Sequence, residues 1–218
     1  MKRAVTFVVQ KYWLTGVLPA FRDGVSPLSA TQLISMLPEY HGLCGLTDDE
    51  VRSIAAAYSG SPKPEDEMLE IRRSFNGYRF CLRSEDLPTL YNPQQVFTHL
   101  QTVSPKGGPF SLSDEANATH SGHVMDSIRG VNILPEFFMN ASNGNLNADV
   151  MKEFGPSEMQ QFGSDNTRLA QSLLYYFGVF TFRMDPKRLV IPNASVRHLV
   201  SPQDFSESCA SAYGFFAV

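Results

Sequence analysis

The chain has 218 residues, of which 43% are hydrophobic, so it can bury one substantial core or two smaller ones. Its 18 Lys and Arg residues face 22 Asp and Glu residues, and the resulting net charge of -4 excludes the broad basic surface of a general nucleic-acid binder. No run approaches the ~18 consecutive apolar residues that would span a bilayer, so no membrane partner is expected.

The cysteines indicate a reducing compartment. Cys44, Cys81 and Cys209 are odd in number and far apart, with no C-x-x-C pair, which argues against a disulfide framework and a zinc site. The apolar run at 4–9 is too short for a signal peptide, and no cleavage site follows it. We therefore expect an intracellular protein, cytoplasmic or nuclear.

The first expected element is a strand. Residues 4–17, AVTFVVQKYWLTGV, are rich in β-branched and aromatic side chains and end at Thr15-Gly16. This composition is typical of a buried strand that closes at a turn.

A helix is expected after Thr47, because Thr47 and Glu50 have the spacing of a capping box. Residues 59–66, SGSPKPED, predict a linker, and a short helical stretch through Met68, Leu69 and Ile71 follows it. The core-facing side chains of the first helix are predicted to be Val51, Ile54, Ala55 and Tyr58.

Two signals follow in the middle of the chain. In residues 74–80, SFNGYRF, the Asn76-Gly77 pair between aromatic residues predicts a hairpin or tight turn with Gly77 at positive φ. Asn92-Pro93 then predicts a helix start, with Asn92 as N-cap and Pro93 at the first helical position. That helix carries the apolar residues Val96, Phe97 and Leu100.

Turn-rich sequence at 104–109 and an Asn-rich run at 140–147 predict breaks. Beyond them, Asp165 or Asn166 is expected to cap a helix that ends at Gly178 and whose core face carries Leu169, Leu173, Tyr176 and Phe177. Strands over 179–182 and 189–191 follow at once. A helix leading into a hairpin is the order of a winged-helix module.

Several motifs stand in register with one family. WLTGV at 13–17, CGLTDDEV at 44–51, FNGYRF at 75–80 and YNP at 91–93 resemble, in order and spacing, the AAA-ATPase-like family, which is related to the P-loop NTPases. SLLYYFG at 172–178 and LVIPN at 189–193 resemble the segment that follows the ATPase-like core there. The signature positions carried over are Gly16, Asn76, Gly77, Tyr78, Phe80, Asn92 and Pro93.

The resemblance implies a mixed α/β fold that is mostly helical. Residues 1–60 would be the C-terminal remnant of the AAA-ATPase-like core, 61–160 a helical middle or lid region, and 161–218 a winged-helix-like module with a C-terminal tail. A remnant sheet would expose apolar faces and an open edge, so we expect the chain to be oligomeric or prone to aggregation. The missing partner would be an unknown protein or the remainder of a larger parent chain.

The intact family architecture binds ATP and Mg²⁺, but the sequence has no G-x-x-x-x-G-K-[ST] loop and no acidic pair closing an apolar strand. It also has no Glu-x-Lys, which a restriction-like nuclease would need. We therefore expect no catalytic residue and no cofactor in this chain. The resemblance leaves Thr15 as a candidate sensor of the nucleotide, beside its alternative role as a turn residue before Gly16.

Two functions remain open from the sequence. The first is a part of a nucleotide-dependent switch that lacks the phosphate-binding loop. The alternative is a non-catalytic module that binds protein or DNA through the winged-helix-like region, whose basic residues are Arg183, Lys187, Arg188, Arg197 and His198.

Other candidates have weaker support. His120 and His123 lack a third ligand at a recognised spacing, so a metal site is not expected. A set of aromatic residues has spacings typical of a core, and we prefer that interpretation to a base-stacking platform: Tyr78, Phe80, Tyr175, Tyr176 and Phe177.

Overall fold

The computed structural model describes residues 15–16, 32–81, 87–103, 135–155, 158, 166–184 and 187–200. Its elements are, in chain order, η2 (Pro38–Leu43), α2 (Asp48–Ser59), α3 (Glu65–Phe75), α4 (Pro93–Val103), α6 (Pro135–Ser142), β1 (Leu146–Asn147), α8 (Thr167–Tyr176), β2 (Thr181–Arg183), β3 (Arg188–Val190) and α9 (Ala194–Leu199). The fold is mixed α/β, with far more helix than strand in these ranges. Within them, no helix combines the length and apolar character that crossing a membrane requires.

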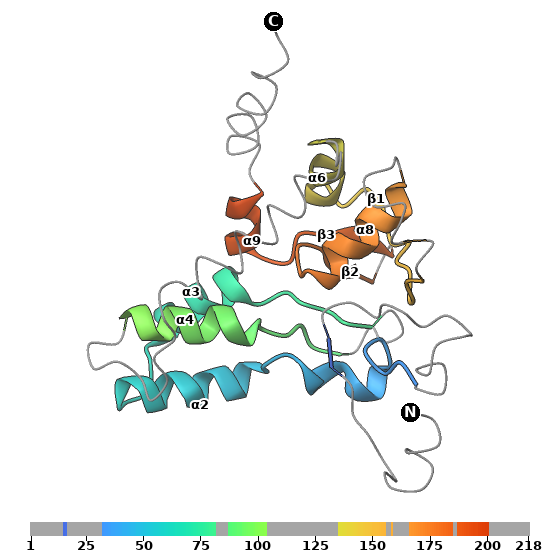
Figure 1. Ribbon diagram of the computed structural model, residues 1–218. Coiled ribbons are helices and arrows are strands. Elements are labelled where there is room, and N and C mark those ends of the chain that lie inside the picture. Colours follow the sequence, from blue (N-terminus) through green and yellow to red (C-terminus); the bar gives the residue numbers. More distant parts are fainter. Residues whose placement is uncertain are drawn as a thin grey trace, which may run out of the picture.

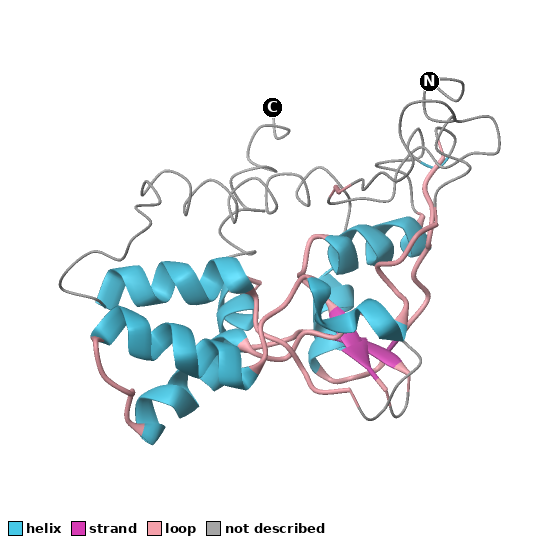
Figure 2. Ribbon diagram, turned by 90° about the horizontal axis from the view of Figure 1, so that it is seen from below, coloured by secondary structure: helices cyan, strands magenta, loops and turns pink. Residues whose placement is uncertain are grey.

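The elements form two groups, which Figures 1 and 2 show side by side. We call α2, α3 and α4 the helical unit, and α6, β1, α8, β2, β3 and α9 the sheet unit. Each unit surrounds its own cluster of buried apolar side chains. The boundaries expected at residues 60 and 160 stay predictions.

The capping box at the start of α2 is confirmed. The Thr47 hydroxyl accepts from the Glu50 N–H at 3.4 Å, and the Glu50 carboxylate accepts from the Thr47 N–H at 2.7 Å. These bonds satisfy main-chain donors that a helix N-terminus leaves open. The helix ends at Gly60, which adopts the left-handed conformation with φ of 72°.

One amphipathic face of each helix builds the core of the helical unit. The buried residues of this cluster are Val51, Ala55, Met68, Ile71, Tyr91, Val96 and Leu100, with Ile54 and Tyr58 packed against them. Leu69 lies in α3, as expected, and is 59% exposed. It lies about 100° around the helix from Met68, and that turn carries it to the solvent side.

The SFNGYRF segment, residues 74–80, is a turn but not a hairpin. Phe75 is the last residue of α3, Asn76 caps the helix, and Gly77 has a φ of 118°, so its positive φ is confirmed. The chain then runs extended, and Tyr78 forms an isolated antiparallel bridge with Leu90. The Asn-Gly pair therefore turns the chain as it leaves a helix. It does not join two strands, as the turn of a hairpin would.

Helix α4 begins as expected at Pro93. The Asn92 side chain accepts from the Gln95 N–H at 3.3 Å, and Val96 and Leu100 are buried. Phe97 is half-buried and lies against Tyr58, with ring centroids 6.5 Å apart.

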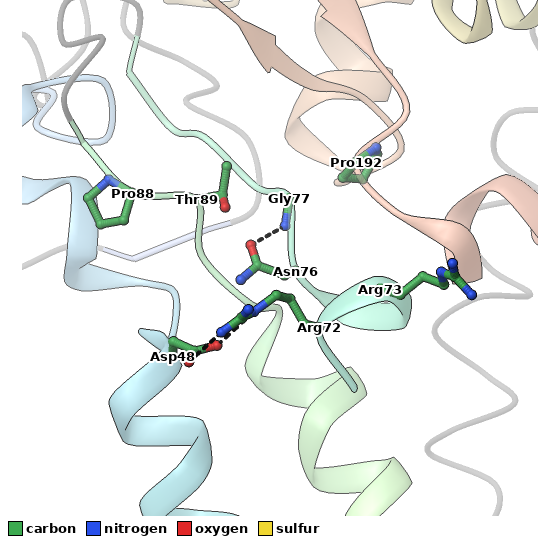
Figure 3. Close-up of a pocket in the computed structure, with 8 residues that line it drawn as sticks. All are labelled: Asp48, Arg72, Arg73, Asn76, Gly77, Pro88, Thr89 and Pro192. Carbon is green, nitrogen blue, oxygen red and sulfur yellow. Dashed lines mark hydrogen bonds and ion pairs between the residues drawn. The ribbon is translucent and has the colours of Figure 1, made fainter. Parts of the chain in front are cut away.

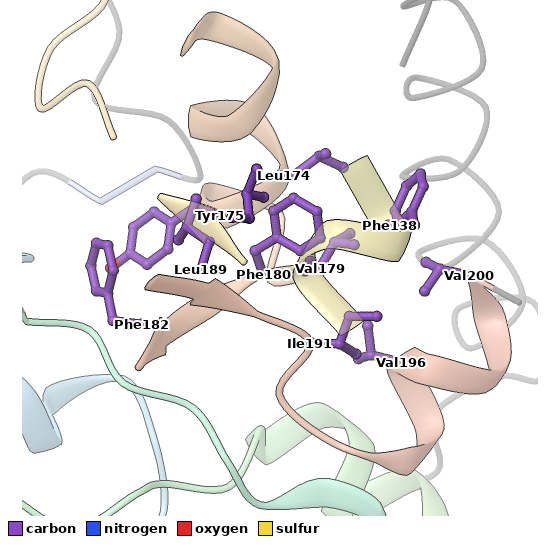
Figure 4. Close-up of a cluster of buried hydrophobic side chains, with 12 residues drawn as sticks. Phe138, Leu174, Tyr175, Val179, Phe180, Phe182, Leu189, Ile191, Val196 and Val200 are labelled. Carbon is purple, nitrogen blue, oxygen red and sulfur yellow. The ribbon is translucent and has the colours of Figure 1, made fainter. Parts of the chain in front are cut away.

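The sheet unit contains a three-stranded antiparallel sheet of order β1-β3-β2. The β2–β3 hairpin is confirmed, while β1 was not anticipated because it falls in the Asn-rich run. The register aligns Leu146, Leu189 and Phe182 across the three strands, and all three are buried. Figure 4 shows the apolar cluster to which these side chains belong, between the sheet and the helices.

Helix α8 packs on this sheet and is buried around its whole circumference. Asn166 caps it by accepting from the Leu169 N–H at 3.1 Å, and Gly178 follows it with φ of 77°. Seven consecutive residues, from Leu169 to Tyr175, are buried. Leu174 and Tyr175 join the main cluster, whereas Leu169 and Leu173 pack with Phe154 in a smaller one.

Candidate functional site

An open cleft of about 420 Å³ lies between the helical unit and the sheet unit. Figure 3 shows its lining residues, which come from the starts and ends of several elements: Asp48, Arg72, Arg73, Asn76, Gly77, Pro88, Thr89 and Pro192. The cleft therefore lies where the SFNGYRF segment passes between the two units.

Asp48 is the most strongly bonded group in the cleft. Its carboxylate accepts from Arg72 Nη2 at 2.7 Å, from the Tyr91 hydroxyl at 2.6 Å and from Arg52 Nε at 3.0 Å. Partial burial would raise the pKa of Asp48, but hydrogen bonds from Arg72, Tyr91 and Arg52 outweigh it and hold that pKa at about 2. An acid that is ionised and saturated with donors is unsuited to act as a general base.

The network around Asp48 ties three helices together. Arg52 reaches from α2 to α3, where its two Nη atoms each donate to Glu65 at 2.8 Å. Arg72 approaches from α3, and Tyr91 lies just before α4. Arg73, by contrast, points away from the Asp48–Arg72 pair (Figure 3) and has no bonded partner among the described residues. The described residues of the cleft thus form a structural ion cluster and include no poised acid or base.

The neighbouring Asn76-Gly77 turn contacts the sheet unit directly. Asn76 Oδ1 accepts from the Gly77 N–H at 2.5 Å, which fixes the turn. A Cβ added at Gly77 would overlap the carbonyl oxygen of Pro192 and come within 2.8 Å of its carbonyl carbon. Only glycine allows the two main chains to approach this closely.

The signature residues Tyr78 and Asn92 lie close to Asn193 at the Tyr78 hydroxyl. The side chains of Asn92, ahead of α4, and Asn193, ahead of α9, both lie near it. Burial raises the pKa of Tyr78, and these two amides act against that rise. Asn193 also caps α9 by accepting from the Val196 N–H at 3.0 Å. The Tyr78 phenol therefore lies between the beginnings of two helices that belong to different units.

The main chain beyond Tyr78 is held by side chains from far along the sequence. The Thr181 hydroxyl accepts from the Arg79 N–H at 2.7 Å and donates to the Arg79 carbonyl at 3.3 Å. The Tyr175 hydroxyl donates to the Phe80 carbonyl at 3.2 Å, and His41 Nδ1 accepts from the Phe80 N–H at 3.4 Å. The other ring nitrogen of His41, at 2.9 Å from the Pro88 carbonyl, must then carry the proton.

The structure brings the central signature residues together and leaves the first ones apart. Asn76, Gly77, Tyr78 and Asn92 all lie at this junction, while Pro93 begins the adjoining helix. Phe80 stacks on Tyr78, with ring centroids 6.2 Å apart and planes 12° apart.

Thr15 and Gly16 are exposed, have no regular secondary structure and do not line the cleft. The rest of the strand expected over 4–17 lies outside the described residues, and so do His120 and His123. Among the described ranges, no three His, Cys, Asp or Glu side chains gather closely enough to hold a metal ion.

The aromatic residues weighed as a stacking platform belong to the interior, as preferred above. Tyr78 and Tyr175 are buried, and Phe80, Tyr176 and Phe177 are half-buried. Burial raises the pKa of Tyr175 and Tyr176 far above the usual value for tyrosine.

The sequence did not single out Asp48, Arg72, Tyr91, Thr181 or His41. Asp48 lies in the capping sequence and Arg72 in an ordinary helical run, so neither has a local signal. Thr181 and His41 act through partners 102 and 39 positions away, and such pairs leave no trace in local spacing.

No family model, curated protein or solved structure matches the chain, so the resemblance to the AAA-ATPase-like family stays a prediction.

Proposed function

We propose that the chain is a non-catalytic coupling part of a nucleotide-dependent switch of the AAA-ATPase-like type. In this proposal the lid-like region over 61–160 supplies α3 and α4 of the helical unit, and the winged-helix-like module over 161–218 supplies α8, β2, β3 and α9 of the sheet unit. The observation that carries the proposal is the position of the signature residues, which join the two units at the SFNGYRF segment.

The topology of the sheet unit supports the winged-helix-like interpretation. Helix α6 precedes β1, and α8 precedes the β2–β3 hairpin, whose second strand pairs with β1. A helix followed by a hairpin is the order expected from the sequence, and β1 adds a third strand to it.

The helical unit and the sheet unit are coupled in this proposal because the SFNGYRF segment between them has little freedom to move. Its main chain is hydrogen-bonded to Thr181, Tyr175 and His41. Gly77 also packs directly against the main chain of Pro192. A shift of α3 must therefore displace the loop between β3 and α9. Packed interfaces of this kind move between discrete arrangements and are not continuously deformable.

Reading of DNA by α8 is disfavoured. A recognition helix must present a polar face to the major groove, but seven consecutive residues of α8 are buried. The net charge of -4 also argues against DNA binding. We therefore propose that the switch acts on protein and not on nucleic acid.

Hydrogen exchange of the full chain, followed by mass spectrometry, tests the coupling. In the wild type, amides of α2 and α4 should open with the same free energy as amides of β2 and β3, as members of one cooperative unit. Gly77→Val should make the helical unit and the sheet unit open separately. Gly60→Val is the matched control, because Gly60 also has positive φ but has nothing within 4 Å of an added Cβ. Different opening free energies of the two units in the wild type would overturn the proposal.

A further inference from the structure

The sheet carries a row of cations on one face. The register places Arg183 of β2 directly opposite Arg188 of β3, and Arg188 opposite Asn147 of β1. Residues opposite one another in an antiparallel pair point to the same side. Arg183, Arg188 and Asn147 therefore form one row across all three strands, and Lys187 immediately precedes β3.

This face is opposite to the core. The preceding row, Phe182, Leu189 and Leu146, is buried in the apolar cluster, so side chains alternate between the two faces as a pleated sheet requires. Arg183, Lys187 and Asn147 are exposed, and Arg188 is partly so.

The two arginines of the row are register partners, and no described residue neutralises them. Arg188 Nη1 donates to Asn147 Oδ1, and Arg183 Nη1 lies near enough to Gly144 that an added Cβ would be 3.1 Å from it. None of Arg183, Lys187 and Arg188 forms an ion pair within the described part of the chain. Arg168, in the same unit, is by contrast paired with Asp149 at 2.9 Å.

Like charges directly opposite each other on a sheet destabilise the folded state. A protein retains such a pair at low cost when an external anion neutralises it. Guanidinium groups suit carboxylates because they can donate two parallel hydrogen bonds to them. The row thus has the chemistry of a site for consecutive acidic side chains.

We propose that Arg183, Arg188 and Lys187 form a docking surface for an acidic segment of a protein partner. A nucleic acid is the less suitable occupant, since α8 is buried and the chain as a whole is acidic. The proposal does not rest on coupling at the SFNGYRF segment, and it would stand if the two units opened independently.

Fluorescence anisotropy with the full chain tests the proposal, with a labelled oligoglutamate peptide as one probe and a labelled DNA duplex as the other. The wild type should bind the peptide, and the Arg183→Gln/Arg188→Gln double variant should bind it at least roughly tenfold more weakly. Arg168→Gln, which also removes an exposed cation of the sheet unit, should leave peptide affinity within about twofold.

A charge reversal provides a second test, whose expected result could not arise from loss of folding. Arg183→Glu would face Arg188 with an opposite charge, so its melting temperature should rise while peptide binding falls. No peptide binding by the wild type, equal binding by the double variant, or tighter binding of the duplex than of the peptide through these arginines would each overturn the proposal.

Discussion

Gly77 and Pro192, which are 115 positions apart in the sequence, contact each other through main-chain atoms, without an intervening side chain. The φ of 118° at Gly77 lies in a region that other residues rarely adopt. Glycine is therefore required twice at this position, once for its backbone conformation and once for the space.

Replacing Gly77 by Ala should reduce the free energy of unfolding by about 2 to 4 kcal/mol, because the conformational cost and the overlap with Pro192 add. Gly60→Ala has the conformational cost alone, so its free energy of unfolding should fall by only about 1 kcal/mol. Urea midpoints of the two variants and the wild type measure both values. Similar losses at Gly77 and Gly60 would show that the chains are not in close contact.

Thr181→Val should cost about 1 to 3 kcal/mol. The substitution keeps the shape of the side chain but leaves the part-buried Arg79 N–H without its acceptor. Thr102→Val is a suitable control, because the Thr102 hydroxyl donates only to the Thr98 carbonyl on an exposed helix surface. Thermal unfolding of both variants checks the prediction, and a Thr181→Val protein as stable as the control would contradict it.

Asp48→Asn should destabilise the chain by roughly 1 to 3 kcal/mol at neutral pH, because charge-assisted bonds to two arginines are lost. The folded-state pKa of about 2 lies below the ordinary value of 3.8, so ionised Asp48 stabilises the fold above that value. This contribution is lost as the pH falls through the folded pKa. The difference in unfolding free energy between wild type and variant should therefore shrink between pH about 4 and pH about 2. A difference that stays constant over that range would be inconsistent with the Asp48 network.

The chain alone should not bind ATP tightly. Phosphoryl chemistry depends on positioning by a phosphate loop, its Lys and a metal-holding acid, and the sequence contains no such loop motif. One hydroxyl hydrogen bond from Thr15 would supply about 0.5 to 1.5 kcal/mol, against the ~8 kcal/mol of micromolar affinity. Titration calorimetry with ATP and Mg²⁺, beside a phosphate-release assay, measures this. Micromolar binding, or turnover that Thr15→Ala abolishes, would contradict the expectation.

Local signals predicted α2, α3, α4 and α8, whereas η2, α6 and α9 were not anticipated. The Thr47–Glu50 capping box, the Asn92-Pro93 start and the Gly178 end depend on residues within one turn of each other. Such contacts are encoded in spacing alone. β1 was missed because its two residues pair only with β3, about 40 positions later. Two residues are also too few to show the alternation of apolar and polar side chains that identifies a strand.

The candidate site was predicted only in part. The signature residues were found by their resemblance to a family, and the structure adds that they meet at one place. Asp48, in the same cleft, and Thr181, the partner of Arg79, were not found, because their contacts are decided by tertiary packing. Asn76-Gly77 was expected to be a turn, but whether the turn joins strands or leaves a helix depends on the length of α3.

The bonds between Arg79 and Thr181 have a consequence for synthesis of the chain on the ribosome. The two residues are 102 positions apart, and translation at roughly 5 to 20 residues per second delays the second by on the order of 5 to 20 s. Tyr78 and Phe80 lack their C-terminal partners for that time, so the nascent chain presents aromatic surface to chaperones. Slower translation between these two positions should therefore increase chaperone dependence and lower the yield of folded protein.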